Sequence, residues 1–144
     1  MMRLSRLVPA FAVLAAICST GVAFGQSRPT VWDGVYTSAQ ASRGEISYAS
    51  ACASCHAQDL RGDSNTPSIV GVSFQFLWGD MSLGALFAKI QNQMPTDRPN
   101  SLPAQVYTDI LAYVLEANQF PPGEDELTSD PAVLDPIVIT VEAP

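Results

Sequence analysis

The chain has 144 residues, with seven basic and fourteen acidic side chains and one histidine, so its formal net charge is −7. This length predicts one domain rather than two. The acidic balance argues against nucleic acid or an anionic membrane surface as a partner, because both require a basic surface. A protein with a basic docking surface remains compatible with it.

The first 25 residues have the pattern of a secretory signal peptide. Arg3 and Arg6 precede the almost wholly apolar residues 7–22, and the small residues Ala23 and Gly25 mark a cleavage site. The alternative is a retained anchor, since the apolar stretch is nearly long enough to span a bilayer. We expect cleavage and export, most simply to a bacterial periplasm. Two of the seven basic residues and none of the fourteen acidic ones would be lost, which leaves a formal charge of −9.

The next part of the chain is predicted to contain a lead-in, a helix and a long loop. Residues 26–36 are expected to be an extended lead-in, punctuated by Pro and Gly. A helix is predicted over 38–51, with Thr37 or Ser38 as its N-cap. Residues 57–79 are repeatedly interrupted by Gly, Pro and Asn and are predicted to be a loop. The loop is unusually long and rich in large apolar side chains, so we expect it to wrap around something.

Two further helices are predicted over 82–93 and 103–118, where apolar residues recur at helical spacing. The chain then becomes acidic and proline-bearing, and nothing in it indicates a β-rich domain. We therefore expect a small all-α domain over residues 37–122. Residues 123–144 are expected to form an acidic, flexible tail.

The segment "CASCH", residues 52–56, contains the only histidine of the chain and two of its three cysteines. A structural zinc site needs four ligands, usually in two pairs, and no second cluster exists to complete one. A redox dithiol is a better alternative, because a following histidine can lower a thiol pKa. Thioredoxin-like proteins, however, carry their CxxC in a βαβ unit, and no β pattern precedes this pair.

The spacing of Cys52, Cys55 and His56 favours covalent haem attachment most strongly. The two thiols add to the haem vinyl groups, and the one-turn geometry places the next side chain, His56, beneath the iron as proximal ligand. A porphyrin would also supply a large apolar core to a domain of this size. We therefore predict one haem c per chain.

The second axial ligand is predicted to be a methionine, because the chain has no second histidine. Met94 lies at the end of a predicted helix, where Pro95 turns the chain, and a His/Met pair raises the reduction potential of haem iron. Met81, at the start of that helix, is the alternative ligand. Met94 could instead simply fill a gap in the core.

Four segments of the chain resemble the class I cytochromes c: "RGEISYASACASCH", "TPSIVG", "QMP" and "YTDILAYVLEANQF". The resemblance covers about residues 31–121. It implies an all-α class I cytochrome c fold, in which three to five helices wrap around one covalently attached haem. The first and last helices of that family cross where a glycine lets the backbones approach. Four residues match this crossing: Gly44, Tyr48, Ile110 and Tyr113.

The resemblance also implies roles for residues around the haem. Pro67 matches the loop proline whose carbonyl accepts a hydrogen bond from the proximal histidine, a contact that fixes the ring orientation. Trp78 and Arg61 are candidates to contact the haem propionates. Each of these three residues also has a purely structural alternative role.

More narrowly, residues 30–56 and 101–127 resemble cytochromes associated with pyrroloquinoline-quinone (PQQ)-dependent alcohol dehydrogenases. This resemblance implies a periplasmic single-haem electron carrier that performs no substrate chemistry itself. Electrons would come from a quinoprotein dehydrogenase, as its acceptor or subunit, and pass to a downstream cytochrome or oxidase. The alternative function is a haem-based sensor or gas-binding protein, in which the sixth iron position is vacant or weakly held.

Overall fold

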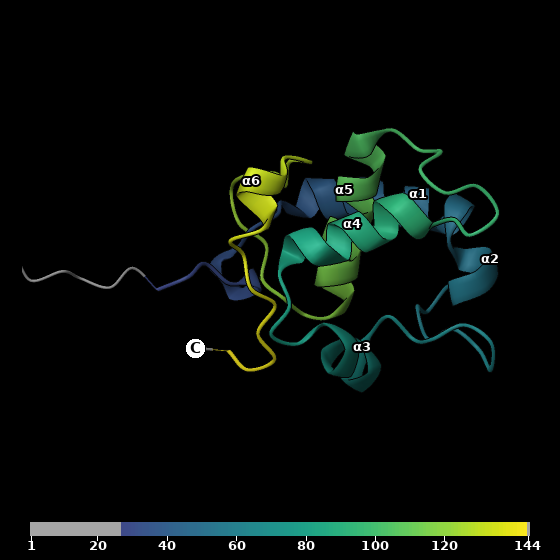
Figure 1. Ribbon diagram of the computed structural model, residues 1–144, viewed down its shortest axis with the longest axis horizontal. Helices are drawn as coiled ribbons and strands as arrows, with labels where there is room; N and C mark the ends of the chain where they lie inside the picture. The colour runs from purple at the N-terminus through teal and green to yellow at the C-terminus, as the bar shows by residue number, and fades with distance from the viewer. Residues whose placement is uncertain (1–26, 144) are drawn as a thin grey trace, which may run out of the picture.

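The computed structural model describes residues 27–143, and Figure 1 shows how its helices are arranged. The predicted signal peptide, residues 1–25, lies outside this range. The elements are η1 (Val31–Asp33), α1 (Ser38–Ala51), α2 (Ala53–His56), α3 (Gly71–Trp78), α4 (Leu83–Gln93), α5 (Ala104–Ala117) and α6 (Pro131–Leu134). Extended chain in the described range contributes only isolated bridges to Val138. The predicted all-α class is thereby confirmed. No helix in the described range is long and apolar enough to cross a membrane.

Helices α1 and α5 cross and form the centre of the fold (Figure 1). Thr37 caps α1, because its side-chain oxygen accepts a hydrogen bond from the backbone N–H of Gln40. At the crossing, a Cβ on Gly44 would overlap the carbonyl oxygen of Asp109 on α5. Only glycine therefore permits this approach of the two backbones. One turn further on, the rings of Tyr48 and Tyr113 lie 5.4 Å apart.

Helix α4 packs across α5 and has the amphipathic pattern expected from the sequence. Ser82 caps it by accepting from the backbone N–H of Ala85 at 3.0 Å. Helix α5 buries most of its residues, and its fully buried apolar side chains include Tyr107, Leu111 and Leu115. Helix α5 therefore presents apolar surface toward α1, and both helices present apolar side chains to the cavity described below.

The predicted loop over residues 57–79 is partly wrong, because its last third is helix α3. No Gly, Pro or Asn occurs between Gly71 and Gly79, so residues 72–78 are free to be helical. Phe74 is buried and holds α3 to the core, whereas Val72 and Phe76 are exposed. In Figure 1, α3 lies apart from the other helices at one edge of the molecule.

The prediction of a flexible tail over residues 123–144 is also wrong, as far as the structure describes it. The side chains of Leu127, Leu134 and Ile139 are buried, with exposed fractions of 3%, 0% and 1%. The segment also pairs with the rest of the chain through its backbone. The N–H of Val31 donates to the carbonyl of Val138 at 3.0 Å, and four further bonds link residues 137–139 to Pro29, Asp80, Met81 and Leu83. The acidic composition suggested a flexible tail, but apolar side chains spaced along the segment anchor it to the core.

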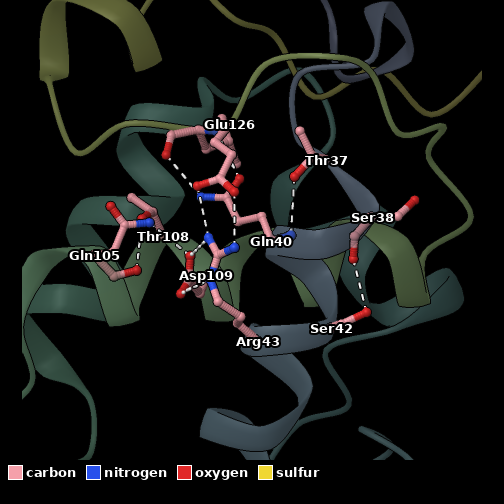
Figure 2. A network of polar contacts seen from close by, with 10 residues as sticks. Thr37, Ser38, Gln40, Ser42, Arg43, Gln105, Thr108, Asp109 and Glu126 are labelled. Carbon is pink, nitrogen blue, oxygen red and sulfur yellow. Dashed lines mark hydrogen bonds and ion pairs between the residues drawn. The ribbon is translucent and has the colours of Figure 1, made fainter.

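Polar contacts, some of them buried, also hold this C-terminal segment (Figure 2). The Gln40 side chain, fully buried, both accepts from the N–H of Leu127 and donates to its carbonyl, at 2.8 and 2.9 Å. The Arg43 guanidinium bonds Asp109 on α5 and Glu126 on the segment. Both carboxylates raise the pKa of Arg43, so it stays charged. Helix α1 thus fastens the segment to α5.

Candidate haem site

A cavity of about 600 Å³ lies among α2, α3, α4 and α5. Both cysteines and the histidine of CASCH line it, and so does Met94. The remaining lining is largely apolar and includes Ile69, Phe74, Leu86, Ile110 and Val114. A volume of this size is in the range of ligand-binding pockets, roughly 300–1,000 Å³.

The two cysteines are separated by one turn of helix. Helix α1 ends at Ala51, and α2 begins after Cys52, whose carbonyl accepts from the N–H of His56 at 2.9 Å. Cys55 is exposed, whereas Cys52 is half-buried. Burial raises the pKa of the Cys52 thiol to about 11. Redox-active CxxC pairs depend on a lowered thiol pKa, so this environment disfavours the dithiol interpretation.

The loop after α2 positions the imidazole of His56. Its Nδ1 lies 3.3 Å from the carbonyl oxygen of Pro67. Because a carbonyl can only accept, Nδ1 carries the proton and Nε2 keeps the lone pair that binds a metal. The loop itself is held by a hydrogen bond from the N–H of Gly62 to the carbonyl of His56, at 2.9 Å. The Tyr48 hydroxyl donates to the carbonyl of Ala57 at 2.7 Å.

Met94 enters the cavity lining from the C-terminal end of α4. Its carbonyl accepts a hydrogen bond from the Tyr107 hydroxyl on α5 at 2.9 Å, which fixes the backbone at this turn. Met81, the alternative ligand, is absent from the cavity lining, and 44% of its surface is exposed. The structure therefore brings Met94, and not Met81, into the cavity with His56.

Of the two candidate propionate contacts, Trp78 and Arg61, only one lies at the cavity. Trp78 lines the cavity, but Arg61 does not. The Arg61 side chain is 77% exposed, and its Nε lies 3.7 Å from Asp59. Two basic residues that the sequence analysis did not single out, Lys89 and Arg98, line the cavity instead. The sequence could have indicated these two residues, because basic residues are rare in this chain and Lys89 and Arg98 flank Met94.

The residues present fit haem c. Two thiols one turn apart suit thioether attachment, an imidazole and a thioether suit iron, and the apolar walls suit a porphyrin. A zinc site gains no support, since no three His, Cys, Asp or Glu side chains gather into a metal-binding group between residues 27 and 143.

An apolar cavity with this set of donors, in an all-α fold, defines a c-type cytochrome. The chain belongs to the family described as cytochrome c oxidase, cbb3-type, subunit III, whose model matches residues 39–114. The cofactor of the protein is therefore covalently bound haem c, and its class of activity is electron transfer.

Among solved structures, the chain is similar to the sulfane dehydrogenase SoxCD from Paracoccus pantotrophus, with a TM-score of 0.49 and 19% sequence identity. The similarity covers 81% of this chain and 68% of that chain. A comparison with curated proteins found no match.

Proposed function

We propose that the protein is a periplasmic electron carrier with a single haem. Cys52 and Cys55 would form the thioether links, His56 would be the proximal ligand and Met94 the distal one. The observation that carries this assignment is that all four side chains line the same apolar cavity. Export through cleavage after residue 25 remains part of this proposal.

A haem held by Cys52, Cys55, His56 and Met94 would supply reversible one-electron chemistry between a donor and an acceptor. The residues of the chain set the conditions for that exchange. Pro67 orients His56 through the contact to Nδ1. A thioether from Met94 favours the ferrous state and raises the reduction potential. The apolar lining keeps water from the iron, and the exposed Cys55 marks an edge that a partner can approach.

The proposed donor is a PQQ-dependent dehydrogenase, with a downstream cytochrome or terminal oxidase as acceptor. The support for it is the resemblance of residues 30–56 and 101–127 to cytochromes that serve such dehydrogenases. In this proposal the substrate is oxidised on the partner, and the chain only carries the electron.

Carbon monoxide distinguishes a carrier from a haem sensor. We expect the visible spectrum of the reduced protein to remain unchanged under carbon monoxide at neutral pH, because Met94 would hold the iron position that the gas needs. The Met94→Ala variant, which opens that position, should bind the gas and serves as the positive control. Rapid binding by the wild-type protein would favour the sensor function instead.

A further inference from the structure

Two of the few positive charges of this acidic chain lie at the cavity. Only five basic residues occur in the part of the chain that the structure describes, and two of them, Lys89 and Arg98, line the cavity. Of the fourteen acidic residues, Asp97 alone lines it. The charge of the cavity lining is therefore opposite in sign to that of the whole chain.

Both cations lack a strong partner within the described residues. The nearest carboxylate to the Arg98 guanidinium is Asp97, at 3.5 Å, and both side chains are more than half exposed, so this pair contributes little. The Lys89 ammonium bonds the neutral amide of Gln93. Each cation is therefore available to pair with an anion at the cavity.

The segment that carries Arg98 is held in place next to Met94. The N–H of Arg98 donates to the carbonyl of Pro95, and the N–H of Asn100 donates to that of Gln91, both at 3.0 Å. The bond from Tyr107 to Met94 fixes the start of the same segment. Arg98 is thus presented by an ordered turn.

We propose that Lys89 and Arg98, rather than Arg61, form the binding site for the two carboxylates of the haem. This inference rests on the proposed haem site. Carboxylates beside an apolar cavity are costly unless they are paired, and Arg and Lys are the side chains that pair with them. Both residues then act as positioning residues, and they also hold positive charge near the iron, which favours the ferrous state.

The test is the midpoint reduction potential of the haem-loaded protein, measured by spectroelectrochemistry at low ionic strength, where screening is weak. Lys89→Gln and Arg98→Gln should each lower the potential, and the double variant should lower it further. Arg61→Gln and Arg28→Gln, which remove the same charge away from the cavity, should shift it much less. Lys89→Arg and Arg98→Lys keep the charge and should restore most of the potential.

Two results would overturn the inference. One is a larger shift in Arg61→Gln than in either cavity variant, and the other is an equal shift in all four neutral variants. If a neutral variant does not incorporate haem, the charge-conserving variant at the same position is measured in its place. A reduction potential of that variant as low as the potential of the double variant would also contradict the inference. Failure of the proposed function is distinguishable, because the wild-type protein would then lack covalent haem or reversible one-electron reduction.

Discussion

Replacement of Gly44 by alanine is expected to destabilise the protein by about 3 kcal/mol or more, at the upper end for an overpacked site. The added Cβ would overlap the Asp109 carbonyl and lie 2.9 Å from the Cβ of Tyr113. Both obstacles belong to α5, and the first is backbone, so no side-chain rotation relieves the contact. The two helices must separate, and the cavity beside them must change. Urea unfolding of the haem-loaded protein, followed by circular dichroism, measures the loss.

Glu45→Ala is the control for Gly44→Ala. Glu45 is the next residue of α1 and is exposed, so its replacement should change the free energy of unfolding by less than about 0.5 kcal/mol. If Gly44→Ala were as stable as this control, the close approach of α1 and α5 would be contradicted.

A chain that ends at Gly123 is expected to lose cooperative unfolding. Truncation there removes four buried apolar side chains: Leu127, Leu134, Ile137 and Ile139. Each contributes roughly 1.5–3 kcal/mol, so the sum is at least about 6 kcal/mol. Whole domains are stable by only about 5–15 kcal/mol. Truncation also leaves the buried Gln40 amide without its two bonds to Leu127. Thermal unfolding and limited proteolysis of the haem-loaded chain report the loss.

Removal of residues 141–144 is the control for this truncation. The described residues among them, 141–143, are exposed. Their loss should leave the free energy of unfolding within about 0.5 kcal/mol of the full chain. A chain ending at Gly123 that unfolds as cooperatively and at the same temperature as this control would show that the C-terminal segment does not stabilise the fold.

The sequence predicted those parts of the structure whose signals are local. The helix over residues 38–51 is found with the same bounds, because its N-cap, Thr37, is readable from a few residues. Gly44 was found through a family resemblance, and its role at the helix crossing follows from the absence of a Cβ. The spacing of the cysteines and the histidine in CASCH, together with the surrounding sequence, predicted covalent haem attachment. Each of these features depends on contacts within one helix or turn, or on the helix crossing that the cytochrome c family shares.

The parts that were missed depend on contacts distant in the sequence. Helix α3 is held by one buried side chain, Phe74, and its pattern is too short to outweigh the glycines before it. The composition of the C-terminal segment is typical of disorder. The side chain of Gln40, 87 residues earlier in the chain, nevertheless donates a hydrogen bond to the carbonyl of Leu127. Arg61 was a candidate propionate contact through the family resemblance, because its guanidinium group can donate hydrogen bonds. Only the fold shows that Arg98 lines the cavity and Arg61 does not.

The optical spectrum of the oxidised protein, produced in a host with haem-attachment machinery, tests the central claim most directly. Sulfur bound to ferric haem iron gives a weak band at long wavelength. We predict that this band is present in the wild type and in Met81→Ala and is lost in Met94→Ala. Absence of the band from the wild type, with high-spin iron, would contradict the claim that His56 and Met94 together bind the haem iron.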